Sequence, residues 1–270
     1  MELFLISMVS MGGLALLLSV GLVLANQKLR VEVDPKVERI TQVLPGINCG
    51  ACGSASCEHF SERVVGGTQP VNGCVVGGSE VAAQVAEIMG TEVGEIQEQI
   101  AMVHCGAAGA VKTLRAKYQG IMTCRTVNLL GGDTACSHGC LGYGDCVEPC
   151  QFDAIHMVDG IPRIDPVKCT ACGQCAKACP RGIITIEPID SARGSILVAC
   201  GSTDPGRKVR QICKVGCIAC RLCQRNCSDG TFKVEDNLSK VDYSKALTCS
   251  DWDVVIEKCP PNTIVEVAPN

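Results

Sequence analysis

Aromatic side chains are scarce in this chain, and it carries no excess of positive charge. Its 270 residues include four Phe, three Tyr and one Trp, and the net charge is −4. A globular core of this size normally takes much of its buried area from aromatic side chains. A second source of stability is therefore expected, either disulfides or bound metal. We expect no nucleic-acid partner, because such binding requires a basic patch.

Motifs for nucleotide binding and nucleophilic catalysis are also missing. The sequence has no G-x-G-x-x-G after a strand and no G-x-x-x-x-G-K-[ST]. No Ser–His–Asp arrangement is recognisable. The histidines His59, His104, His138 and His156 show no paired spacing, and we take them as structural or surface residues. We therefore expect no catalytic residue and no substrate chemistry in this chain itself.

An uncharged apolar stretch, Leu3–Ala25, lies at the start of the chain. It is long enough to cross a hydrocarbon layer of about 30 Å. A secretory signal peptide would have positive charge before the apolar run, whereas Glu2 precedes this run and Lys28 and Arg30 follow it. The positive-inside rule then places everything after the stretch in the cytoplasm. The sequence predicts a single-pass anchor in the inner or plasma membrane, with a core helix as the alternative.

Cysteine is abundant, with 22 in the chain. The cytosol keeps thiols reduced, so these cysteines indicate metal sites rather than disulfides. The clearest motif is C-x2-C-x2-C-x3-C-P over residues 169–180. This run is typical of a [4Fe–4S] cluster, and its fourth Cys binds the neighbouring cluster. Zinc usually takes two separated C-x2-C pairs instead.

The cofactors expected from the spacings are [4Fe–4S] clusters, at least three and by this assignment four. The first set lies near the anchor, and zinc is its alternative because four thiolates also suit zinc. The predicted ligands are Cys49, Cys52, Cys57 and Cys74 for cluster 1; Cys136, Cys140, Cys146 and Cys179 for cluster 2; Cys150, Cys169, Cys172 and Cys175 for cluster 3; and Cys217, Cys220, Cys223 and Cys259 for cluster 4.

Cluster 2 departs from the plain ferredoxin spacing. With Cys140, Cys146 and Cys150 fixed, the middle ligand position falls on Tyr143. A phenol there does not replace a thiolate, so we assign the position to Cys136, four residues before Cys140.

The last part of the chain has lost ligands for a second cluster. Trp252 and Val255 stand where thiolates would be needed. By the crossover rule, Cys259 completes cluster 4. Cys227 and Cys249 are then left as buried thiols, and we expect Trp252 to pack where the lost cluster would lie.

Four further cysteines belong to no tight loop. They are the number that a fifth cluster needs, and local thiol packing is the alternative. They are Cys105, Cys124, Cys200 and Cys213.

The fold class expected is α+β, with a single transmembrane helix, a small helical [4Fe–4S] domain and duplicated ferredoxin-like modules with little regular structure. The duplication is indicated by C-x3-C-x5-C-x3-C, which occurs at 136–150 and again at 213–227. We expect helices over 35–44, 79–89 and 110–118 and short strands over 155–158, 161–165 and 183–187. The expected domains are an anchor over 1–27, a four-Cys domain over 28–92, a linker or helical region over 93–134, a dicluster ferredoxin-like domain over 135–194 and a second, partly degenerate module over 195–270.

The order of these motifs resembles the RnfB family, the iron–sulfur subunits of the Rnf complex, over essentially the whole chain. The matching parts are the uncharged span, INCGACGSASC, VHCGAAGAV, CSHGCLGYGDC and CTACGQCAKACP. The missing ligands at positions 252 and 255 depart from a full eight-cysteine module.

The resemblance implies a membrane complex that passes electrons between reduced ferredoxin and NAD, coupled to Na⁺ or H⁺ translocation. The RnfB member would accept electrons from ferredoxin on the cytoplasmic side. The implied partners are the other Rnf-type subunits, soluble ferredoxin and the membrane. The alternatives are an iron–sulfur subunit of another membrane redox complex, of hydrogenase or formate dehydrogenase type, and a zinc-bound scaffold without redox activity.

Overall fold

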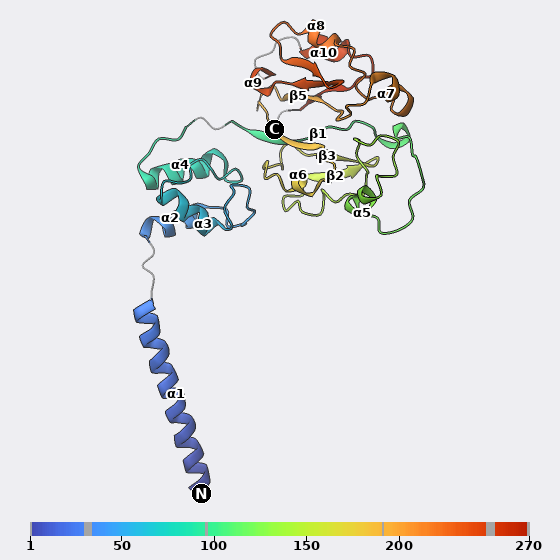
Figure 1. Cartoon of the computed structure of the whole chain (residues 1–270). Helices are drawn as coiled ribbons and strands as arrows, with labels where there is room; N and C mark the ends of the chain where they lie inside the picture. Colours follow the sequence, from blue (N-terminus) through green and yellow to red (C-terminus); the bar gives the residue numbers. More distant parts are fainter. Residues whose placement is uncertain (1, 30–33, 95–96, 191, 247–251, 269–270) are drawn as a thin grey trace.

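The computed structural model describes residues 2–29, 34–94, 97–190, 192–246 and 252–268. Figure 1 shows a long N-terminal helix that stands away from the rest, a small helical domain, and two modules of strands and short helices side by side. Helices and strands are both present, so the predicted α+β class is confirmed.

The N-terminal helix α1 (Glu2–Leu29) has an apolar segment that is not buried against any of the residues that the structure describes. Its segment Ile6–Asn26 is long and apolar enough to cross a membrane, and none of it is buried within the protein. Leu17 and Leu22 are about 70% exposed. A continuous apolar surface of this size is rare on soluble proteins, which indicates membrane association.

The small helical domain comprises α2 (Pro35–Val43), α3 (Cys57–Val65) and α4 (Gly78–Met89). The Asp34 carboxylate accepts the backbone N–H of Lys36 at 2.8 Å and begins α2. Gly90, in the left-handed region at φ 71°, ends α4. The apolar faces of the three helices form one core around Phe60. The two helices predicted in this domain are confirmed, whereas α3 had not been expected.

The first module contains β1 (Gln99–Val103), β2 (Ile155–Val158), β3 (Ile161–Ile164), α6 (Gln174–Ala178) and β4 (Ile184–Pro188). It also contains a 3₁₀ turn, η1 (Gly109–Val111), and α5 (Cys124–Leu129). β1 pairs antiparallel with β4, and β2 with β3. All three predicted strand segments are therefore confirmed.

The second module repeats this arrangement. It contains β5 (Ser195–Val198), α7 (Gly206–Ile212), α8 (Leu222–Asn226), β6 (Phe232–Glu235), β7 (Leu238–Val241), α9 (Tyr243–Ala246), α10 (Trp252–Glu257) and β8 (Ile264–Val267). β5 pairs antiparallel with β8, and β6 with β7. In both modules the first and last strands therefore pair with each other, and the two strands between them in the sequence form a hairpin.

The boundary between the modules is formed by strands that are buried on both faces. Ile100 and Met102 of β1 pack with Leu197 of β5 in one apolar cluster. Ala101 and Val103, the alternate residues of β1, point into the core of the first module. Because successive side chains of a strand face opposite sides, one strand joins two cores and fixes one module against the other.

Two expectations for residues 93–134 differ from the structure. The helix predicted over 110–118 is replaced by η1 and by isolated bridges from Lys112 to Cys213 and from Leu114 to Thr134. The expected linker also provides β1, which pairs with β4 some 80 residues later. Both differences arise because pairing with distant segments outweighs the local helix preference.

Deleting residues 1–27 should give a protein that leaves the membrane fraction and keeps its iron. The reason is that α1 contains no cysteine and contributes nothing to the described cores. Fractionation and iron analysis, with the full chain as control, check this. Loss of iron, or retention in membranes free of partner subunits, would contradict it.

Candidate functional site

Twenty of the 21 cysteines that the structure describes lie in five groups of four, each around its own cavity. Each group is named after one member. They are the Cys49 group (Cys49, Cys52, Cys57, Cys74), the Cys172 group (Cys150, Cys169, Cys172, Cys175), the Cys220 group (Cys217, Cys220, Cys223, Cys259), the Cys146 group (Cys124, Cys140, Cys146, Cys179) and the Cys200 group (Cys105, Cys136, Cys200, Cys213). The first three match the sets expected for clusters 1, 3 and 4.

The Cys49 group lies where the loop after α2 meets the start of α3. The Asn48 side chain accepts the backbone N–H of Cys57 at 2.8 Å. The Gln69 side chain donates to the carbonyl oxygen of Cys52, also at 2.8 Å. These two contacts hold separate parts of the loop in place. The pKa of Cys74 is raised by burial and, secondarily, by the other three thiols of the group.

The Cys172 and Cys220 groups share the same unusual backbone. Ala171 and Ala219, each placed just before a cysteine, have φ near 55°, and Arg221 follows at φ 62°. Positive φ is costly for residues other than glycine, and such strain often marks a functional loop. Three cysteines of each loop line one cavity.

The Cys146 group contains Cys124 instead of the expected Cys136. Cys124 is the first residue of α5, and its backbone N–H donates to the Asp145 carboxylate at 2.7 Å. The N–H of Arg125 donates to the other oxygen of the same carboxylate at 3.0 Å. Because Asp145 directly precedes Cys146, this contact brings Cys124 to the cavity.

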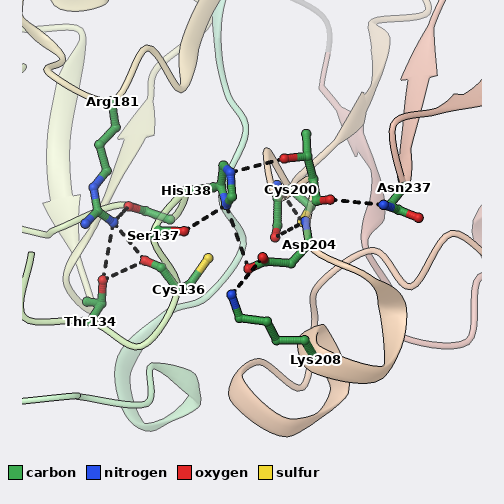
Figure 2. Close-up of polar contacts among 12 residues, drawn as sticks. Thr134, Cys136, Ser137, His138, Arg181, Cys200, Asp204, Lys208 and Asn237 are labelled. Carbon is green, nitrogen blue, oxygen red and sulfur yellow. Dashed lines mark hydrogen bonds and ion pairs between the residues drawn. The ribbon is translucent and has the colours of Figure 1, made fainter. Parts of the chain in front are cut away.

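Cys136 lies instead in the Cys200 group, at the junction of the modules. Its carbonyl oxygen accepts Thr134 Oγ1 and the Arg181 guanidinium, both at 2.9 Å (Figure 2). The bridges at residues 112 and 114 place the segment before Cys136 next to Cys213. The predicted sets for cluster 2 and for the extra cluster therefore differ from the structure by an exchange of Cys124 and Cys136.

The Cys200 group draws two cysteines from each module. A Cβ added at Gly139 would lie 3.4 Å from Cys136 Sγ and 3.8 Å from Cys105 Sγ, so the missing side chain leaves room beside these thiols. His138 lies next to the group, with Thr203 at 3.2 Å and the Asp204 carboxylate at 4.0 Å from its ring nitrogens (Figure 2). These contacts also connect the two modules.

The second half of the C-terminal module is filled by side chains. Trp252 and Val255 are buried with Cys227 in one core, and the Trp252 indole N–H donates to the carbonyl oxygen of Ala246 at 3.0 Å. The Arg193 guanidinium lies 4.1 Å from the centre of the indole ring. Trp252 thus packs as the sequence predicted. Cys249 lies outside the described residues.

The expected structural role of the histidines fits their contacts. The His104 ring nitrogens lie 3.0 Å from the carbonyl oxygen of Val198 and 2.8 Å from Thr185 Oγ1. His59 contacts the backbone N–H of Ala55 at 3.3 Å. The nitrogen atoms of both rings therefore hold segments of the fold together.

Burial keeps many of these thiols protonated in the absence of a cation. It raises the pKa of Cys146 to about 12 and those of Cys140, Cys175 and Cys200 to about 11. A thiol loses its proton when its sulfur coordinates a metal cation. Filling such a site therefore releases protons and stabilises the fold. Four soft thiolates per cavity are the donors that iron–sulfur clusters require, and the residues fit that cofactor.

A single metal ion fits these sites less well. Among the described residues, no three Cys, His, Asp or Glu side chains come close enough to hold one ion. Four thiolates of a zinc site would all lie about 2.3 Å from one centre. The described cysteines do not form such an arrangement.

Two family models match cysteine-rich parts of the chain. A family of Fe-S cluster proteins matches residues 44–76, and a 4Fe-4S binding domain matches residues 162–185. The first range contains the whole Cys49 group, and the second contains three members of the Cys172 group. The fold and these groups define a membrane-associated iron–sulfur protein with ferredoxin-type modules.

Several relatives, each named as the B subunit of an ion- or proton-translocating oxidoreductase complex, match almost the whole chain. The relative from the Na(+)-translocating ferredoxin:NAD(+) oxidoreductase complex of Acetobacterium woodii is 39% identical, over 94% of this chain and 75% of that protein. The relative from the ion-translocating oxidoreductase complex of Methanosarcina acetivorans is 36% identical over 96% of each. The relative from the proton-translocating ferredoxin:NAD(+) oxidoreductase complex of Clostridium ljungdahlii is 39% identical, over 90% of this chain and 86% of that protein. The chain belongs to this family, the RnfB subunits of the Rnf-type ion-translocating complexes.

Replacing Cys124 and Cys136 singly should remove two different clusters. Cys124→Ser should lose about four irons from the Cys146 group, and Cys136→Ser about four from the Cys200 group. Iron analysis and low-temperature EPR of both variants, with Cys140→Ser as a same-site control, check this. If Cys124→Ser keeps all its iron while Cys136→Ser and Cys140→Ser lose the same signal, the grouping expected from the sequence spacing is correct instead.

Cys259 and Cys227 form a second test pair. Cys259 lines the cavity of the Cys220 group, whereas the Cys227 thiol donates to the Asp229 carboxylate at 2.7 Å. Cys259→Ser should therefore lose about four irons and Cys227→Ser none. Iron content and EPR of the two full-length variants decide the matter, and the opposite result would show local rather than crossover ligation.

Proposed function

We propose that this chain relays electrons within an Rnf-type ferredoxin:NAD oxidoreductase complex, and that its five cysteine groups each hold a [4Fe–4S] cluster. A bound cluster of this kind supplies a one-electron carrier. The observation that carries the proposal is a set of contacts and shared cavity walls that links the five groups in one series. The order is Cys220, Cys200, Cys146, Cys172 and Cys49.

Contacts between cysteines connect the first three groups. Cys200 and Cys217 are buried in the same core cluster, which places the Cys220 group beside the Cys200 group. The backbone N–H of Cys140 donates to Cys105 Sγ at 3.3 Å. Cys140 also lines both neighbouring cavities, so the Cys200 and Cys146 groups share a wall.

Crossed cysteine pairs join the Cys146 and Cys172 groups. Cys146 and Cys150 are four residues apart and face different cavities, and so do Cys175 and Cys179. The exchange is the ferredoxin pattern, in which one run completes the neighbouring site. Each connecting segment is three residues long, and this keeps the two sites adjacent.

The last step crosses to the helical domain. Gln174 lies between two cysteines of the Cys172 group, and its side-chain amide donates to the carbonyl oxygen of Cys49. This contact supports placing the Cys49 group at one end of the series, on the domain that α1 connects to the membrane.

The orientation and the partners follow from the same proposal. Lys28 lies in the last turn of α1, at the end from which the other domains continue. The positive-inside rule favours a cytoplasmic location for those domains. There they could take electrons from soluble ferredoxin and pass them to other subunits. Since the sequence carries no nucleotide-binding motif, NAD would react on another subunit.

Anaerobically purified full-length protein tests this function. We expect about 20 irons per chain, four for each of five groups, with matching sulfide and a brown colour. Reduced ferredoxin should bleach the spectrum. About 16 irons would exclude one group, and a colourless zinc protein would overturn the proposal.

A further inference from the structure

The two ends of the cysteine series carry opposite charge. Residues 34–98, which hold the Cys49 group, contain nine acidic and three basic residues. Residues 205–228, which span the loops of the Cys200 and Cys220 groups, contain six basic residues and no acidic one. We call these six the basic face: Arg207, Lys208, Arg210, Lys214, Arg221 and Arg225.

All six side chains of the basic face are exposed. Within the described part of the chain, Lys208 is the member that forms an ion pair, with Asp204 at 2.8 Å. Lys258 adds a further exposed cation beside the face, 2.8 Å from Asn226 Oδ1. Positive charge that the protein leaves largely uncompensated is available to a partner.

Parts of the basic face lie beside two of the cysteine groups. Val209 and Ile212, on the same helix as Arg207 and Arg210, line the cavity of the Cys200 group. Arg221 itself lines the cavity of the Cys220 group. A partner bound here would therefore lie within a few side chains of a candidate redox site.

We propose that the basic face docks a small acidic electron-carrier protein and that the Cys220 group is the first to receive its electron. This inference rests on the proposed electron-transfer function. Complementary charge steers such an encounter and raises its rate, whereas the acidic domain around the Cys49 group repels the same partner. The charge difference thus gives the series a direction, from the basic face toward the membrane domain.

An anionic lipid surface is the competing partner for exposed cations. Figure 1 favours a protein, because α7 and α8 lie at the end of the molecule away from α1. The transfer itself is balanced: the reduced carrier loses one electron, the Cys220 site gains it, and no bond or proton changes.

The test measures binding of an oxidised two-cluster acidic ferredoxin to the full-length protein in phosphatidylcholine nanodiscs. Lys214→Glu/Arg225→Glu reverses two charges of the basic face without touching a cysteine cavity. Lys36→Glu/Arg39→Glu on α2 is the matched control, since both side chains are exposed and the net charge changes equally. We expect about tenfold weaker binding or more for the first variant and no weakening for the control.

Salt dependence and a neutral double substitution test whether the loss of ferredoxin binding is electrostatic. The difference should shrink as ionic strength rises, because the screening length falls from about 10 Å at 0.1 M to about 3 Å at 1 M. Lys214→Gln/Arg225→Gln should fall between wild type and charge reversal. Equal binding by wild type and both charge-reversed variants would overturn the proposal. The proposal would also be overturned if the wild-type protein lost ferredoxin binding in nanodiscs of equal phosphatidylcholine and phosphatidylglycerol. That result would assign the basic face to anionic lipid.

Two further readouts separate the possible failures. Carbodiimide cross-linking of wild type to ferredoxin should join Lys214 or Lys258, and cross-links at Lys36 instead would overturn the docking site even if the variants fail to fold. Iron content is measured on the same samples. Full iron without ferredoxin binding overturns the docking alone, whereas protein without iron–sulfur clusters overturns the proposed function.

Discussion

The structure depends on the convergence of buried thiols in groups of four. The apolar cores of both modules contain these same cysteines, for example Cys217 and Cys223 in one and Cys140 and Cys175 in the other. The cavity walls and the hydrophobic core are thus largely the same residues. In a chain with so few aromatic side chains, we expect cofactor binding to be coupled to folding.

The duplicated modules are fixed to each other by two kinds of contact. Apolar residues of β1 and β5 fill their boundary, and Tyr243 of the second module contacts the Met102 sulfur of the first at 3.4 Å. The Cys200 group then takes cysteines from both sides of the same boundary. A centre held there would link the modules chemically as well as by packing.

Charge gives this series its polarity. The helical domain near the membrane is strongly acidic, and the loops of the second module are basic. Because the cationic side chains lie on the cavity-forming loops themselves, the docking of an acidic carrier and its distance from a redox site are set by the same residues. Electrostatic steering of the carrier and electron transfer from it therefore both favour the end of the molecule that holds the basic face.

The sequence by itself determined the features that depend on short spacing. The membrane helix, two helices of the small domain, the strands and the cysteine sets within tight loops, such as Cys169, Cys172 and Cys175, all follow from residues close together in the chain. Tertiary structure decided the rest. The sequence could not show that β1 belongs to the first module, or that Cys124 and Cys136 exchange places. The Asp145 carboxylate accepts a hydrogen bond from the first backbone N–H of α5, and an isolated bridge pairs Lys112 with Cys213. These contacts join segments 21 to 101 residues apart, and no local pattern records them, because their geometry exists only after the strands have paired.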